Sequence, residues 1–93
     1  MLSKIPLEIK SVNKEDLDKE IVRVGLIAEL DAINLYEQLA AMTDNALLKK
    51  VLLDIALEEK VHVGEFQELL VRLDKEHAPS LEKGKEEISE FGQ

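Results

Sequence analysis

A ladder of side chains spaced by three or four residues runs through the second half of the sequence. Its members are Leu48, Leu52, Ile55, Glu59, His62, Phe66, Leu69 and Leu73. Residues at this spacing share one face of an α-helix, so the ladder predicts a single long helix that packs against another helix. Glu59 and His62 are its only polar members, and they are neighbours at its centre. Two polar side chains in the middle of an apolar face need a chemical explanation.

Size and composition exclude several functional classes. A chain of 93 residues forms at most one small domain, which buries a limited share of its own surface and often depends on an oligomer. Without cysteine it forms no disulfide, zinc–thiolate site or iron–sulfur cluster. A net charge of −8 argues against a nucleic-acid partner, since phosphate binding uses a basic face. No apolar run approaches the length of a membrane span, so we expect no membrane partner.

The pattern predicts an all-α fold in three parts. Residues 1–12 are interpreted as an extended N-terminal arm, and residues 13–74 as an antiparallel hairpin of two long helices. Residues 75–93 are expected to form a tail that contains one short helix. The hairpin is the part that can build a site.

Candidate capping and breaking residues predict where the helices begin and end. Asn13 is a candidate N-cap of the first helix, and Thr43 or Asp44 of the second. We expect a break around residues 78–80, because proline at position 79 disfavours helical conformation in the residue before it, and a short third helix over residues 80–91. On this interpretation His77 lies at the end of the second helix and has no functional role.

The first predicted helix carries two adjacent apolar stripes. One consists of Val22, Leu26, Ile33, Tyr36 and Ala40, with Glu29 interrupting it, and the other of Ile21, Ala28, Ala32, Leu35, Leu39 and Met42. A helix that is apolar over so much of its circumference is expected to have more than one neighbour. The second helix is one neighbour. We expect the other to come from a second copy of the chain, so that two hairpins form a four-helix bundle.

The polar interruptions of the two helices are predicted to meet. With the turn near Asp44, Glu29 lies fifteen residues before it and Glu59 fifteen after it. Equal separations from the turn mean equal height in an antiparallel hairpin. His62 is one turn from Glu59, and Tyr36 lies on the same face as Glu29, two turns nearer the loop.

Two carboxylates at one height repel each other and cost several kcal/mol when they are desolvated. A cation removes both penalties, and carboxylates with imidazole suit iron, manganese or zinc. One hairpin supplies a glutamate and a Glu-x-x-His pair, which is half of the ferritin-like di-iron ligand set. A homodimer would complete the set around two iron ions, with Glu29, Glu59 and His62 from each chain.

The segments IAELDAINLYEQLA (27–40) and ALEEKVHVGEF (56–66) resemble the encapsulated ferritins. These are two-helix ferritin-like proteins that are held as cargo in encapsulin nanocompartments or fused to the shell protein, and the resemblance covers roughly residues 17–74. It implies a ferroxidase that oxidises Fe(II) to Fe(III) at a dimer interface. It also implies a ring of dimers such as a decamer, a cytoplasmic location and an encapsulin shell that stores the mineral.

By this resemblance Glu29, Glu59 and His62 are the ferroxidase ligands, and Tyr36 lies near the metal ions. Asp31 retains a carboxylate where the family has a secondary acid on the path of iron to the centre, which makes it a candidate further metal contact.

Two positions depart from the family pattern. Family members carry a further acidic residue just before the metal-binding glutamate and a tryptophan before the tyrosine. This sequence has Ala28 and Leu35 at those positions.

Two other functions remain open. The chain can be a helical interaction module in which Glu29, Glu59 and His62 form a buried polar network that fixes register and oligomeric state. It can also carry a rubrerythrin-like peroxidase or oxygenase centre, although the sequence has no cysteine for a rubredoxin-type electron donor. Glu58 offers a rival pairing with His62, but its face also carries Asp54, which is typical of solvated surface.

Overall fold

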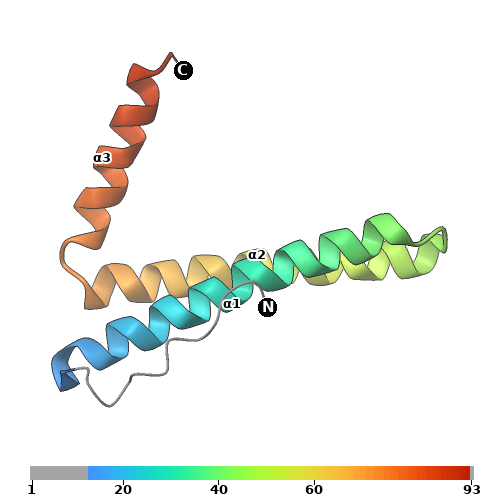
Figure 1. Ribbon diagram of the computed structural model, residues 1–93, viewed down its shortest axis with the longest axis horizontal. Coiled ribbons are helices and arrows are strands. Elements are labelled where there is room, and N and C mark those ends of the chain that lie inside the picture. Colours follow the sequence, from blue (N-terminus) through green and yellow to red (C-terminus); the bar gives the residue numbers. More distant parts are fainter. Residues whose placement is uncertain (1–12, 93) are drawn as a thin grey trace.

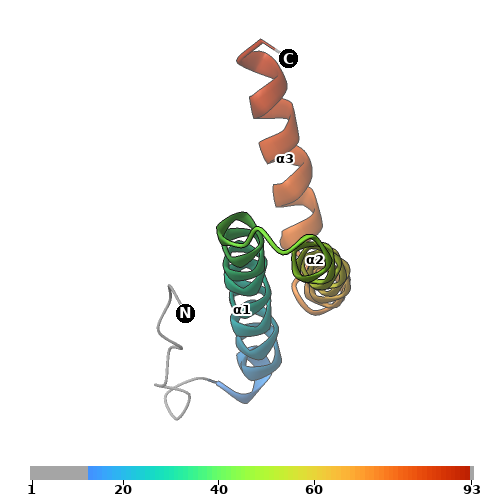
Figure 2. The same cartoon turned by 90° about the vertical axis from the view of Figure 1, so that its right-hand side faces the viewer.

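The computed structural model describes residues 13–92, with the backbone alone described for Glu15. This part of the chain forms three α-helices, α1 (Lys14–Met42), α2 (Ala46–Leu73) and α3 (His77–Glu90), and contains no strand. α1 and α2 lie side by side as an antiparallel hairpin (Figure 1), and α3 projects away from the open end of the hairpin (Figure 2). The predicted all-α fold is confirmed. The arm predicted at residues 1–12 lies outside the described residues, and the division of the chain at residues 12 and 74 stays a prediction.

The first helix begins at the predicted place but without the predicted side-chain cap. Asn13 is the N-cap residue, yet its side chain makes no capping hydrogen bond. Its backbone carbonyl accepts hydrogen bonds from the N–H groups of Asp16 and Leu17, at 2.9 and 3.1 Å. Helix α1 then continues for 29 residues, which gives the site a long, regular support.

The cap of α2 is Asn45, so the prediction of Thr43 or Asp44 is wrong. The Oδ1 atom of Asn45 accepts a hydrogen bond from the N–H of Leu48 at 2.9 Å, which pairs one of the free donors at the start of the helix. Thr43 contributes differently, because its Oγ1 accepts a hydrogen bond from the N–H of Asn45 at 3.1 Å. The turn is nevertheless centred on Asp44, so the two long helices run back from it in step.

The break before α3 comes earlier than predicted. The chain turns at residues 74–76, where the Oδ1 atom of Asp74 accepts a hydrogen bond from the N–H of Glu76 at 3.0 Å. Helix α3 begins at His77, so the expected break around residues 78–80 and the expected start at residue 80 are wrong. Pro79 sits in the first turn of α3, where a backbone N–H has no partner within the helix, so the missing donor costs nothing. His77 is therefore the first residue of α3 rather than the end of α2.

The hairpin has a thin core. Within the described chain, the buried hydrophobic residues are Val22, Ala40, Ala56 and Leu70. The deepest positions of α2 are thus Ala56 and Leu70, each one residue away from the predicted ladder. The ladder itself is covered unevenly: Leu48 is 46% exposed and Leu69 is 45% exposed, whereas Leu52, Ile55 and Phe66 are partly buried.

A large apolar surface remains uncovered on the hairpin. Seven large hydrophobic side chains of α1 and α2 are at least half exposed: Ile21, Leu30, Leu35, Met42, Leu47, Leu57 and Val61. Such a surface is large for a chain of this size. It agrees with the expectation that the first long helix has a further neighbour, and the second copy of the chain stays a prediction. No helix in residues 13–92 is long and apolar enough to cross a membrane.

Candidate metal centre

Two helices bring three potential metal ligands together. Glu29 comes from α1, and Glu59 and His62 come from α2. The Nδ1 atom of His62 lies 3.4 Å from Oε2 of Glu29 and 3.3 Å from Oε2 of Glu59. Across the three residues, the potential ligand atoms all lie within 4.8 Å of one another. The predicted convergence is confirmed, while the role of these side chains as metal ligands stays a prediction.

The three side chains differ in exposure. The side chains of Glu29 and Glu59 are 19% and 20% exposed, whereas that of His62 is 46% exposed. The carboxylates are therefore largely covered by the hairpin itself, and the imidazole borders solvent. Leu30, which follows Glu29, and Val61, which precedes His62, are 50% and 62% exposed, so uncovered apolar side chains flank the group along both helices.

The charges in this group do not balance. Both carboxylates face the same imidazole nitrogen, which carries at most one proton to donate. The two distances exceed the usual 2.9–3.0 Å of a nitrogen–oxygen hydrogen bond, so neither contact is a strong one. Within residues 13–92, His62 is the ion-pair partner of both carboxylates, and even a protonated imidazole offsets only one of the two negative charges. A divalent cation would satisfy the whole group.

The donor set fits iron well. Two carboxylate groups and one imidazole nitrogen are ligands that suit iron, manganese and zinc. Three donors from one chain leave coordination positions open for a second set of protein ligands or for solvent. The remaining acids near this level do not join the group: Asp31 and Glu58 lie outside the set of atoms within 4.8 Å.

The other predicted site residues occupy different positions. Tyr36 is seven residues after Glu29 on α1, which places it two turns nearer the loop, and its side chain is partly exposed. Asp31 is two residues after Glu29 and therefore lies on another face of the helix, with an interaction of its own. The predicted roles of Tyr36 and Asp31 near the metal stay predictions.

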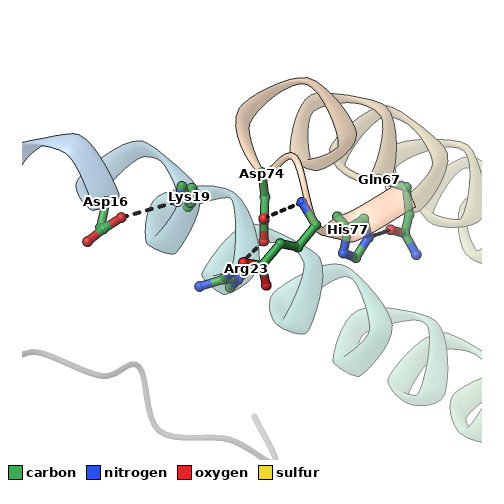
Figure 3. Close-up of polar contacts among 7 residues, drawn as sticks. Asp16, Lys19, Arg23, Gln67, Asp74 and His77 are labelled. Carbon is green, nitrogen blue, oxygen red and sulfur yellow. Dashed lines mark hydrogen bonds and ion pairs between the residues drawn. The ribbon is translucent and has the colours of Figure 1, made fainter. Parts of the chain in front are cut away.

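A second polar cluster, which the sequence did not indicate, lies where α2 meets α3 (Figure 3). The guanidinium of Arg23 on α1 donates a hydrogen bond from Nη2 to Oδ2 of Asp74 at 2.8 Å. The ring N–H of His77 donates from Nε2 to Oε1 of Gln67 at 2.7 Å. The hydrogen bond from the N–H of Glu76 is the main cause that holds the pKa of Asp74 below its ordinary value; partial desolvation opposes it, and Arg23 adds to it. We call these residues the α2–α3 corner.

Comparison with known proteins identifies the family. The EncFtn-like family model matches residues 5–84 of the chain. The chain belongs to the EncFtn-like family. This EncFtn-like chain is 53% identical over 82 residues to the ferritin-like-encapsulin shell fusion protein of Pyrococcus furiosus, a match that covers 88% of the chain and 24% of the fusion protein. It is 46% identical over 57 residues to the encapsulin nanocompartment cargo protein EncC of Myxococcus xanthus, covering 61% of the chain and 44% of that protein.

The structural comparison agrees with the sequence comparison. The EncFtn-like chain superposes on the crystal structure of the encapsulated ferritin domain from Pyrococcus furiosus with a TM-score of 0.83 and 44% sequence identity. The superposition covers 99% of this chain and 96% of that one. The resemblance to encapsulated ferritins is therefore confirmed. The chain spans less than half the length of either curated relative, and about a quarter of the fusion protein.

Proposed function

We propose that this EncFtn-like chain is a ferroxidase, and that its di-iron centre forms between two copies of the chain. Glu29, Glu59 and His62 of each copy would supply the ligands. The observation that supports this function best is the convergence of two carboxylates on one imidazole nitrogen, at 3.3 and 3.4 Å, without a matching positive charge. Iron is the substrate here, because Fe(II) binds, gives up an electron and leaves as Fe(III).

A second copy is part of the proposal for two reasons. One hairpin offers two carboxylates and one imidazole, whereas the ferritin-like set contains four glutamates and two histidines. Two copies would give four negative charges, which two Fe(II) ions balance. Three apolar members of the ladder that carries Glu59 and His62 are 39–46% exposed in the single chain, namely Leu48, Leu69 and Leu73. A second hairpin packed against this face would cover that apolar surface and complete the site at the same time.

The side chains would perform three tasks. Glu29 and Glu59 would hold two Fe(II) ions close together, so that both electrons reach the same oxidant. In the balanced reaction two Fe(II), one O2 and two protons give two Fe(III) and one H2O2. The carboxylates would favour oxidation, because fixed negative charge stabilises the higher charge of Fe(III). His62 of each copy would supply one neutral nitrogen donor to one of the two ions and leave the charge balance unchanged.

The names of the relatives support a role in iron storage inside an encapsulin compartment. One relative is a ferritin-like domain fused to an encapsulin shell, and the other is an encapsulin cargo protein. We propose that this chain likewise works with an encapsulin shell, and that Fe(III) passes from the centre to a store within the shell.

The test compares Glu59→Ala with Glu58→Ala, an adjacent and exposed acid that lies outside the group. Bound iron, the rate of Fe(II) oxidation in air and the native mass would be measured for both variants and the wild type. We expect Glu59→Ala to slow oxidation at least about a hundredfold, since loss of a residue that only supports a ligand already costs about 10- to 100-fold. Glu58→Ala should behave as the wild type. Oxidation by Glu59→Ala at the wild-type rate would refute the proposal.

The same samples separate the other two functions. If the three residues formed only a structural network, chelation of metal would leave the melting temperature of the wild type unchanged. If the centre were an oxygenase or peroxidase, aerobic addition of iron with an organic reductant would yield an oxidised organic product. We expect ferric iron as the product instead.

A further inference from the structure

Helices α1 and α2 approach each other unusually closely at Gly25. A Cβ atom added at this position would lie 2.7 Å from Cε1 and Cζ of Phe66, and 3.2 Å from its Cδ1. Cβ atoms in proteins essentially never come so near another carbon atom, so the approach depends on the missing side chain. Gly64 and Gly84 differ, because a Cβ at either position would meet no atom within 4 Å.

This contact lies directly beside the metal centre. Gly25 is four residues before Glu29 on α1, and Phe66 is four residues after His62 on α2. Because the two helices are antiparallel, four residues back along α1 and four residues forward along α2 both lead one turn in the same direction. Gly25 is therefore level with Phe66 if Glu29 is level with His62. The distance between the helices at Gly25 therefore governs the distance between Glu29 and His62, which is 3.4 Å between Oε2 and Nδ1.

We propose that Gly25 and Phe66 act as a spacer that sets the helix separation at the metal centre, and thus as positioning residues for its ligands. Glycine in the interior of a helix is unfavourable relative to alanine. The local cost is explained if only glycine lets the Phe66 ring lie against the backbone of α1. The inference rests on the proposed function for its effect on oxidation, but its geometric part concerns the helices alone.

Alanine at position 25 would have to move something. Ordinary contact needs about 3.4–4 Å between carbon atoms, so either α1 retreats or the Phe66 ring turns by up to about 1 Å. A retreat of α1 would carry Glu29 away from His62, because Gly25 is one turn from Glu29. A turn of the Phe66 ring would change the packing one turn from His62. A misplacement of about 1 Å at a reacting group can cost about a hundredfold in rate.

The experiment compares Gly25→Ala with Gly64→Ala in the full chain. Both changes replace a helical glycine, but only the first adds a Cβ against a neighbour. Three properties would be measured: the rate of Fe(II) oxidation, the visible absorption of bound Co(II) as a probe of coordination geometry, and the imidazole NMR signals of the metal-free protein. His77 in the α2–α3 corner supplies the internal NMR control.

We expect Gly25→Ala to slow oxidation about 10- to 100-fold, change the Co(II) absorption and shift the imidazole signal of His62 but not that of His77. Gly64→Ala should match the wild type in all three. The double variant Gly25→Ala/Phe66→Leu, which replaces the ring with a smaller side chain, should recover most of the rate and the wild-type His62 signal.

Three results would contradict the proposal that Gly25 and Phe66 act as a spacer. The first is a Gly25→Ala protein that equals Gly64→Ala in the Co(II) and His62 signals. The second is a double variant that recovers nothing. The third applies if Gly25→Ala does not fold: the double variant should then fold and bind Co(II), and its failure would assign Gly25 another role. Failure of the proposed function is distinct, because the wild type would then not oxidise iron while the His62 signal still responded to Gly25→Ala.

Discussion

The metal centre and the α2–α3 corner each combine a histidine with acidic side chains, but they solve the charge problem differently. In the corner, Asp74 has a guanidinium at 2.8 Å, and His77 donates a 2.7 Å hydrogen bond to an amide oxygen. In the centre, two carboxylates share one imidazole nitrogen at 3.3 and 3.4 Å. Short, matched pairs satisfy themselves, whereas long contacts with excess negative charge leave room for a cation. Charge balance and distance, rather than residue type, are therefore what distinguish the proposed metal centre from the self-satisfied corner.

The two clusters also differ in the helices that they connect. The corner joins three elements of one chain, since Arg23 comes from α1, Asp74 follows α2 and His77 opens α3 (Figure 3). The centre is flanked along α1 and α2 by the exposed apolar side chains of Leu30 and Val61. The corner thus fixes where α3 leaves the hairpin, while we propose that a second copy of the chain completes the centre.

Substitution of the two histidines is the most sensitive test of the difference between the centre and the corner. We expect His62→Ala to lower the rate of Fe(II) oxidation at least about a hundredfold, because it removes a ligand and not merely a supporting residue. We expect His77→Ala to oxidise Fe(II) at the wild-type rate and to lose about 1 kcal/mol of stability with its hydrogen bond to Gln67. Stopped-flow oxidation and thermal unfolding of both variants check the pair. Equal oxidation by the two variants would mean that the centre and the corner do not differ in kind.

Metal removal should affect the centre alone. An ion that binds only the native state stabilises it by about 2.7 kcal/mol when the free ion is at a hundred times its dissociation constant. Mn(II) replaces Fe(II) in this measurement, so that the metal is not oxidised while the protein unfolds. We therefore expect Mn(II) to raise the melting temperature of the wild type and of His77→Ala. Glu59→Ala should show no such rise. A rise of the same size in Glu59→Ala would locate the metal elsewhere.

Removing one carboxylate should have opposite effects with and without metal. Glu29→Gln removes one of two like charges that are about four-fifths covered, so we expect the metal-free protein to gain up to about 1 kcal/mol of stability. The same variant should lose the stabilisation by Mn(II). Arg23→Ala in the corner should only destabilise, since it leaves Asp74 without its cation. Urea unfolding with and without Mn(II) measures the free energy of unfolding of each variant. If Glu29→Gln lost stability in the absence of metal, the negative charges of the centre would be balanced without a cation.

The sequence predicted the features that depend on local periodicity. The spacing of the ladder gave the long second helix, and equal distances from Asp44 gave the meeting of Glu29, Glu59 and His62. Both follow from the fixed rise of a helix and from a short turn, so no tertiary information was needed. The buried face of the second helix was predicted less accurately. The most buried positions of α2, Ala56 and Leu70, are each one residue away from the ladder.

The missed features depend on choices that periodicity does not make. Asn45 caps α2 although Thr43 and Asp44 are also good capping residues, and only the path of the turn decides among them. The contact of Gly25 with Phe66 depends on how two helices pack, which the spacing of residues along one helix does not reveal. A glycine one turn from a predicted ligand, opposite an aromatic residue in the same register, was the available signal.

The smallest predicted effect concerns the pH dependence of the corner. The pKa of Asp74 is below its ordinary value of 3.8 in the folded protein, chiefly because its carboxylate accepts the hydrogen bond from the N–H of Glu76. A lowered pKa in the folded state stabilises the protein above the unfolded pKa, and this stabilisation is lost as the pH falls through the folded pKa. The stability difference between the wild type and Asp74→Asn should therefore be constant from about pH 5 upward and shrink below pH 4. Urea unfolding of the metal-free proteins between pH 2.5 and 7 measures it, with Asp54→Asn, an exposed acid on α2, as the control. If the difference persisted unchanged at the lowest pH, the corner would be held by its hydrogen bonds as a neutral group and not by the charge of Asp74, and the contrast with the metal centre would lose its electrostatic basis.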